Sequence, residues 1–127
     1  MSATARFFLI CAGGALGTGA RYFLATAVTR AFGHFPFGTL AVNVLGSFLA
    51  SVLMVLALEK SVLSQDLRLI LVTGVMGGFT TYSSFNYETL HLAQSGATTL
   101  AALNVLVTLV VCFVAGIAGI WLARQFT

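Results

Sequence analysis

Long apolar stretches without charge constrain this chain more than any other feature of its sequence. The segments 39–58, 69–87 and 96–123 contain no charged side chain, and a further stretch from Phe7 to about Val28 is interrupted only by Arg21. Each stretch is close to the ~20 residues that an α-helix needs to cross a bilayer. We therefore expect an all-α integral membrane protein, a single domain over residues 1–127 with four transmembrane helices embedded in lipid.

Composition excludes several classes of protein. Only 7% of the 127 residues are charged, whereas soluble domains carry about 25%. So few charges cannot cover a soluble surface of this size, which excludes a soluble enzyme, a nucleic-acid-binding protein and a disordered chain. The His, Cys and acidic residues never gather at the spacing of metal ligands.

Four crossings would place both ends of the chain on one side of the membrane. Short loops at 30–38 and 59–68 and a turn at 91–96 would connect the spans. The basic start and apolar run at 6–19 also suit a signal peptide, but the apolar pattern continues past Arg21, so we expect this segment to be retained. The basic residues give a modest bias toward termini inside the cell. They are Arg6, Lys60, Arg68 and Arg124 on the side of the termini, against Arg30 on the other.

Polar residues recur every four positions in two of the stretches, so each set lies along one face of a helix. Small and hydroxyl residues at this spacing serve close helix packing in membranes, or they line a wet pathway for an ion. The asparagines favour the pathway, because an amide buried without partners costs on the order of 2–7 kcal/mol. The two tracks are Thr39, Asn43, Ser47 and Ser51 in 39–58, and Asn104, Thr108 and Cys112 in 96–123.

The first stretch carries Gly13, Gly17 and Arg21 at the same four-residue spacing. The two glycines form a GxxxG pattern, which favours close helix packing. A lone arginine in a span costs about 2.5–3.5 kcal/mol on insertion scales. Arg21 therefore either reaches an interface or a structural partner with its long side chain, or attracts anions into a vestibule.

The third stretch is poor material for a straight helix. Glycine, threonine and serine crowd its middle at 77–84, and these residues have low helix propensity. Backbone released from helical bonding inside a membrane must be buried in protein or line a cavity. The segment is thus either a kink that serves packing or a broken helix at an ion site.

Three motifs resemble the CrcB/Fluc fluoride channels. The run from Gly77 to Phe85, GGFTTYSSF, followed by Glu88-Thr89, is similar to the family pattern on its third helix. The segment 38–43, GTLAVN, matches the second helix, and 13–17, GGALG, followed by Arg21-Tyr22 matches the first. The likeness extends over nearly the whole chain in length, span count and order.

The resemblance implies an antiparallel, dual-topology homodimer in the cell inner membrane, with two fluoride pores along the subunit interface. It implies that the broken third helices cross at the dimer centre. There the backbone carbonyls of Gly77 and Thr80 would hold a structural Na⁺, a hard ion that suits oxygen ligands.

The resemblance also implies which residues meet fluoride, a small and strongly hydrated anion that needs dense hydrogen-bond donors. Asn43 matches the pore amide of the family, and Phe85 matches one pore phenylalanine, whose ring edge is positive. Tyr82 stands where the family has its other phenylalanine. Further pathway donors are expected from Ser83, Ser84, Thr39, Asn104 and Thr108, and Arg21 and Glu88 are expected to be vestibule or structural charges.

Three other functions are weighed against the channel. A small four-helix multidrug or cation exporter needs an acidic residue inside its first span, where this chain has Arg21 instead. A purely structural membrane subunit would explain the small residues but not the asparagine tracks. A fluoride/proton antiporter would need a titratable relay, which the sequence does not offer. Passive fluoride conduction is therefore the predicted function, with no enzymatic activity.

Overall fold

The computed structural model describes residues 1–126. These residues form helices joined by short connections, without any strand among them. In chain order the elements are α1 (Ala3–Phe32), α2 (Phe37–Leu58), α3 (Gln65–Arg68), the π-helix η1 (Leu69–Met76), α4 (Gly77–Phe79), α5 (Tyr82–Gln94) and α6 (Thr98–Gln125).

Helix α1 is longer at both ends than the predicted span Phe7 to Val28. Its start is fixed by Ser2, whose hydroxyl accepts a hydrogen bond from the backbone N–H of Ala5. Its end is fixed by Gly33, which has a positive φ of 76° and donates its N–H to the carbonyl of Thr29. Glycine adopts this left-handed conformation without steric cost, so the helix ends here and not at the charge of Arg30.

The predicted connections are partly wrong. Residues 30–32 and 37–38 are helical, so the first loop is only 33–36. The second loop contains the short helix α3, and α5 continues to Gln94 where a turn was expected from 91. Ser64 explains α3, because its side chain accepts a hydrogen bond from the N–H of Leu67 and caps the new helix.

The third apolar stretch is helical on both sides of an extended dipeptide. Helix runs without a gap from Gln65 to Phe79 and resumes at Tyr82. Between them Thr80 (φ −83°, ψ 159°) and Thr81 (φ −150°, ψ 116°) are extended. Thr81 then caps α5, because its hydroxyl accepts a hydrogen bond from the N–H of Ser84 at 3.2 Å.

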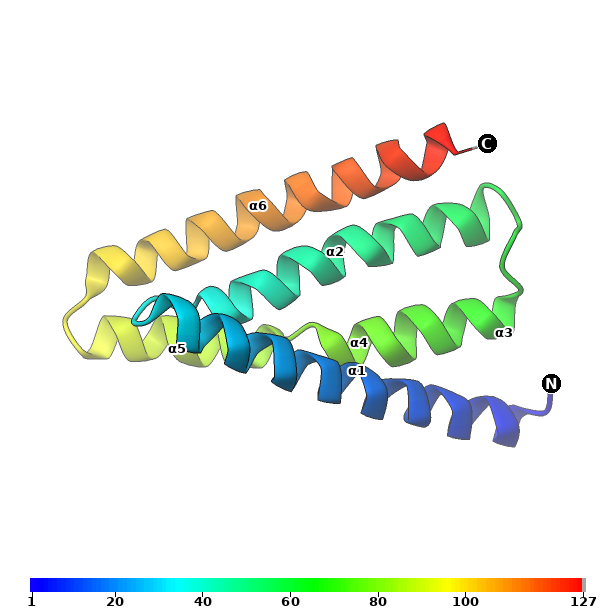
Figure 1. The fold of residues 1–127 in the computed structure, drawn as a ribbon, viewed down its shortest axis with the longest axis horizontal. Coiled ribbons are helices and arrows are strands. Elements are labelled where there is room, and N and C mark those ends of the chain that lie inside the picture. Colours follow the sequence, from blue (N-terminus) through cyan, green and yellow to red (C-terminus); the bar gives the residue numbers. More distant parts are fainter. Residues whose placement is uncertain (127) are drawn as a thin grey trace.

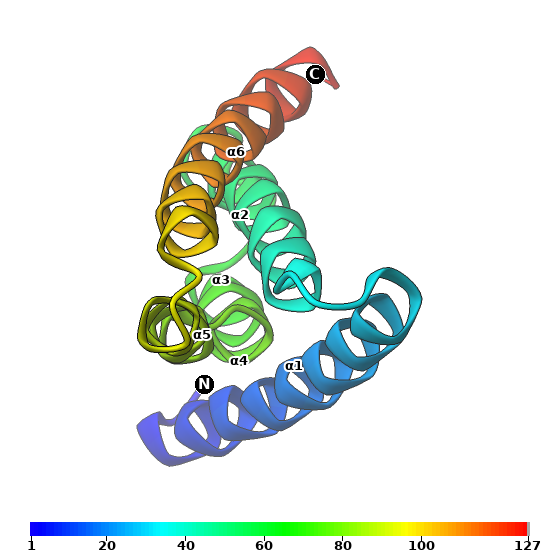
Figure 2. The same cartoon turned by 90° about the vertical axis from the view of Figure 1, so that its left-hand side faces the viewer.

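The helices are arranged side by side, with α6 along α2, and α1 across η1 and α4 (Figures 1 and 2). Both chain ends and the connection between α2 and α3 lie at one end of the molecule, and the other two connections lie at the opposite end (Figure 1). Helices α1, α2 and α6 are each long and apolar enough to cross a membrane. Many large apolar side chains on them are exposed, so the chain is an integral membrane protein whose apolar surface meets lipid.

Close packing of α1 on the third segment depends on glycine. An added Cβ at Gly17 would overlap the carbonyl oxygen of Val75 and lie 2.9 Å from the backbone N of Phe79. An added Cβ at Gly78 would overlap the carbonyl of Gly14. Backbone atoms cannot move aside as a flexible side chain can, so these glycines set the distance between the helices.

Substitution of Gly17 by alanine is expected to destabilise the protein by about 1–3 kcal/mol, because α1 must move away from η1 and α4. The melting temperature of the purified protein in detergent measures this loss. Gly19→Ala is the matched control, since no heavy atom lies within 4 Å of its added Cβ. Equal melting temperatures for the two variants would show that the close approach is not important for stability.

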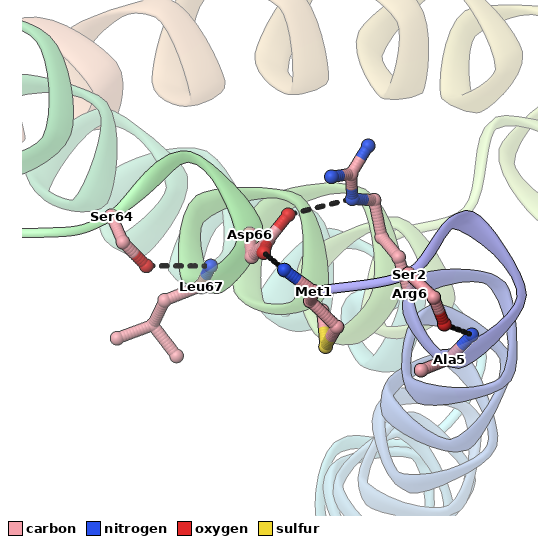
Figure 3. Close-up of polar contacts among 7 residues, drawn as sticks. All are labelled: Met1, Ser2, Ala5, Arg6, Ser64, Asp66 and Leu67. Carbon is pink, nitrogen blue, oxygen red and sulfur yellow. Dashed lines mark hydrogen bonds and ion pairs between the residues drawn. The ribbon is translucent and has the colours of Figure 1, made fainter.

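Ion pairs tie the helix ends together at the end that carries the termini (Figure 3). Arg6 Nε donates to Asp66 Oδ1 at 2.6 Å, and the amino terminus of Met1 lies 3.4 Å from Asp66 Oδ2. Partial burial opposes ionisation of Asp66, but these hydrogen bonds and charges outweigh it and lower its pKa below the ordinary 3.8. The contact therefore contributes fully to folding stability above the ordinary pKa of 3.8, and its contribution is lost as the pH falls through the lowered pKa of Asp66.

Candidate functional site

The interruption at Thr80 and Thr81 frees backbone groups, and Asn43 on α2 bonds two of them. Asn43 Oδ1 accepts the N–H of Thr81 at 2.8 Å, and Asn43 Nδ2 donates to the carbonyl of Thr81 at 3.0 Å. Asn43 thus replaces the helical bond that the Thr81 N–H has lost and adds a donor to the carbonyl of Thr81, which is the N-cap of α5. An amide nitrogen carries two hydrogens, so one N–H of Asn43 is left for another acceptor.

Arginine and threonine side chains bond other groups near the interruption. Arg21 Nη1 donates to the carbonyl of Thr80 at 3.2 Å. The hydroxyl and the N–H of Thr80 both donate to the carbonyl of Met76, at 3.0 and 2.9 Å. Arg21 therefore has a structural partner inside the molecule, as one of the two sequence interpretations required.

The carbonyls of residues 77–80 lose their helical donors at the interruption, those of Gly77 and Thr80 among them. In a continuous helix the carbonyl of Gly77 would accept from Thr81, whose N–H instead donates to Asn43. The carbonyl of Thr80 would accept from Ser84, whose N–H instead donates to the hydroxyl of Thr81. These are the two oxygens that the resemblance assigned to Na⁺, and each keeps acceptor capacity for a cation, since a carbonyl has two lone pairs. Side-chain ligands do not compete, because no group of three or more His, Cys, Asp or Glu residues gathers within 1–126.

Three hydroxyls gather at the first turn of α5. Thr81 Oγ1 lies 3.1 Å from Ser84 Oγ and 3.2 Å from Ser83 Oγ. Ser83 is exposed, Ser84 is half-buried, and neither lines the groove described next. The N-terminus of a helix carries partial positive charge, so this cluster is a favourable place for an anion.

An open groove of about 700 Å³ runs along α2 and α6 beside the interruption. Apolar side chains make most of its walls, and a few polar groups converge on it, which is typical of sites for small ligands. Of the predicted site residues, the structure brings together in this groove Asn43, Tyr82, Phe85, Thr108, Gly77 and Thr80. Its other polar lining residues are Ser47, Ser51, Thr81 and Cys112.

Two aromatic rings border the groove in an edge-to-face arrangement. The ring centroids of Tyr82 and Phe85 are 5.6 Å apart, with an angle of 62° between the ring planes. Phe85 is 9% exposed, whereas Tyr82 is 77% exposed. In this geometry the positive edge of one ring meets the negative face of the other, which fixes how the edges are presented.

Four further residues form two polar contacts outside the groove. Thr39 donates to Glu88 Oε1 at 2.7 Å, and Glu88 Oε2 is buried without a hydrogen-bond partner among residues 1–126. Asn104, only 2% exposed, donates to Thr89 Oγ1 at 2.8 Å, and that hydroxyl donates to the carbonyl of Phe85 at 2.7 Å. The structure thus places the predicted residues Thr39, Glu88 and Asn104 where α5 packs on α2 and α6.

Thr81 and Thr89 were not among the predicted site residues. Thr81 holds the interruption through its backbone and the hydroxyl cluster through its side chain. Its position directly before a helical segment, with a hydroxyl that can cap, is the signal that could have identified it. Thr89 follows Glu88 in the motif, but only the fold shows that it faces Asn104.

Comparison with known proteins gives a consistent answer. The family described as CrcB-like protein, Camphor Resistance (CrcB), matches residues 8–120. A curated relative from Anaeromyxobacter sp. (strain K), named fluoride-specific ion channel FluC, is 54% identical over 121 residues, which is 94% of this chain and 96% of the relative. Relatives of the same name from Sorangium cellulosum and Geobacter sulfurreducens are 52% and 50% identical, over 94% and 88% of this chain and 95% and 91% of the relatives.

Proposed function

The chain belongs to the CrcB-like family, whose relatives above are named fluoride-specific ion channels, and on this premise we propose that its groove conducts fluoride passively through the membrane. The family assignment confirms the resemblance predicted from the three motifs. It identifies an ion channel and not an enzyme. The cell inner membrane is the location we propose for it.

The observation that carries the proposal is the convergence of donors and ring edges on one groove. A bare fluoride ion needs donors in place of its water, and Asn43 has one N–H left after bonding Thr81. Thr108 adds a hydroxyl to the lining, and the paired rings of Tyr82 and Phe85 add positive edges. None of the lining residues is acidic, so an anion meets no fixed negative charge along this wall.

A fluoride efflux assay in proteoliposomes tests this function. Vesicles loaded with fluoride should empty when a potassium ionophore compensates the charge, and chloride should remain inside. Passive conduction requires no proton exchange, so the rate should not depend on a pH gradient. Substantial chloride efflux, or fluoride movement that occurs only with a pH gradient, would contradict the proposal.

The site also supports an antiparallel homodimer with one pore on each side of a shared interface. In a single chain the groove is open, and Tyr82, Ser83 and Asn86 are exposed. Exposure of such polar groups to hydrocarbon costs on the order of 2–7 kcal/mol for each unpaired group. A second copy would cover them and close the grooves. In this arrangement residues 69–87 form the fourth membrane span, which is broken at Thr80 and Thr81.

Labelling of one loop position is expected to reveal both orientations. Ser64→Cys lies in the loop between α2 and α3, and Val62→Cys, 65% exposed in the same loop, leaves the Ser64 cap intact. In cells that express a variant free of Cys11 and Cys112, an impermeant thiol reagent should label about half of the molecules from either side. Labelling from one side only would exclude dual topology while leaving dimerisation possible.

The freed carbonyls of Gly77 and Thr80 support a structural Na⁺ at the dimer centre. Two copies would present four oxygens to one hard monovalent cation, whose bound charge would also favour an anion nearby. Arg21 takes one lone pair of the Thr80 carbonyl and leaves the other.

Replacement of Na⁺ by choline at constant ionic strength is expected to lower the melting temperature and the fraction of dimer. A cation bound only to the folded dimer stabilises it by mass action. Thermal unfolding and size-exclusion chromatography in detergent measure the two quantities. Identical values in the two salts would exclude the site without bearing on fluoride conduction.

A further inference from the structure

The groove beside the interruption extends toward the end of the molecule that carries the termini. A second hollow of about 270 Å³ lies between α2 and α6, and Ala50, Ser51 and Ile120 line both hollows. The second hollow ends at Leu58 and Glu59, where α2 ends. The two hollows therefore adjoin along α2 and α6, with Tyr82 and Phe85 on the first and Glu59 on the second, at the end that we call the mouth.

Glu59, which lines this mouth, forms an ion pair with Arg124 at the end of α6, although Arg124 itself lines neither hollow. Arg124 Nε donates to Glu59 Oε2 at 2.8 Å, and Arg124 Nη2 donates to Glu59 Oε1 at 2.6 Å. Both side chains remain well exposed, at 56% for Arg124 and 42% for Glu59. The hydrogen bond and charge of Arg124 lower the pKa of Glu59, so the carboxylate is ionised at neutral pH.

The geometry of this pair differs for an anion and for a cation. Both carboxylate oxygens of Glu59 are occupied by Arg124. A guanidinium has five N–H groups, and three of those of Arg124 have no hydrogen-bond partner among residues 1–126. An anion that arrives at the mouth therefore finds donors, while the negative charge is covered.

We propose that Arg124 is the anion-recruiting residue at the mouth of the fluoride path, and that Glu59 is a positioning residue that holds it there. This inference rests on the proposed function of the groove. Arg124 raises the local concentration of fluoride at the entrance, and Glu59 fixes the guanidinium beside the hollow. Without Arg124, the carboxylate of Glu59 would lie bare at the mouth and repel anions.

A second ion pair provides the matched control. Arg6 and Asp66 also join two helices at the end with the termini (Figure 3), but neither lines the groove or its extension. If ion pairs at this end serve only to fasten helices, Arg6→Gln and Arg124→Gln should have similar effects. If the pair at the mouth recruits anions, only Arg124→Gln should alter fluoride entry.

The test is the initial rate of fluoride efflux at two ionic strengths, set with an impermeant salt. At about 0.01 M, where charges act over about 30 Å, Arg124→Gln should lower the rate about two- to threefold. At about 1 M, where they act over about 3 Å, its rate should approach that of the wild type. The double variant Glu59→Gln/Arg124→Gln should recover part of the loss at low salt, because the bare carboxylate is gone.

Arg6→Gln and Asp66→Asn should match the wild type at both ionic strengths. An Arg124→Gln rate equal to that of Arg6→Gln, or a loss of the same size at both ionic strengths, would overturn the recruiting role. Absence of fluoride efflux from the wild type would overturn the proposed function itself. If the wild type conducts and Arg124→Gln behaves like Arg6→Gln, only the recruiting role is overturned.

Discussion

Substitution of Phe85 by isoleucine is expected to reduce fluoride efflux by at least about tenfold, which corresponds to about 1.4 kcal/mol in the barrier. Isoleucine has similar bulk, but it has no positive ring edge to meet an anion. Phe85 also holds the Tyr82 ring by an edge-to-face contact at 5.6 Å. Phe85→Ile therefore removes one ring edge from the groove and also removes the contact that holds the ring of Tyr82.

Tyr82→Phe is the matched comparison, because it retains the ring and loses only a hydroxyl. We expect its efflux to stay within about twofold of the wild type, a change of about 0.4 kcal/mol in the barrier. Size-exclusion chromatography and circular dichroism confirm that both variants keep their fold and assembly. A Tyr82→Phe variant that does not conduct, beside a normal Phe85→Ile, would show that the hydroxyl carries the ion and that ring edges do not.

The sequence predicted the composition of the groove better than its extent. The four-residue track on α2 placed Asn43, Ser47 and Ser51 on one face, and all three line the groove. Thr39 belongs to the same track, but it bonds Glu88 on α5 instead. Periodicity identifies the face of a helix, but it does not indicate where a neighbouring helix begins to cover that face.

The same reason explains the placement of Asn104. The track on α6 predicted one wet face from Asn104 to Cys112, and the structure places Thr108 and Cys112 on the groove. Asn104 lies one turn earlier, where α5 packs on α6, and its amide bonds Thr89. Its role in the fluoride pathway stays a prediction, since a buried amide serves packing and conduction with the same hydrogen bond.

The location of the interruption depends on contacts between segments far apart in the sequence. Glycine and hydroxyl residues at 77–84 predicted a weak helix, but their low helix propensity does not show at which of these residues the helix is interrupted. The helix opens at Thr80 and Thr81 because Asn43 and Arg21, from two other helices, supply bonds for the backbone groups released there. Local propensity could indicate the segment, and only tertiary contacts choose the residues.

Asn43→Asp is expected to have the largest effect of any single substitution in the groove. The change replaces the amide that donates to the Thr81 carbonyl with an oxygen that faces the same carbonyl at about 3 Å. It also places a negative charge beside the anion path. A carboxylate about 5 Å from a passing anion, at an effective dielectric constant of about 20, raises its energy by roughly 3 kcal/mol. Fluoride efflux should therefore fall more than about a hundredfold.

Asn43→Ala separates the charge from the lost hydrogen bonds. Alanine removes both bonds from Asn43 to the Thr81 backbone but adds no charge, so its efflux should lie between those of the wild type and the aspartate variant. Melting temperatures should fall for both variants, because alanine loses both bonds to Thr81 and aspartate loses the bond to the Thr81 carbonyl. Aspartate and alanine variants with equal efflux at equal melting temperature would show that the amide acts only by holding the interrupted backbone. An aspartate variant that conducts like the wild type would show that fluoride does not pass Asn43 at all.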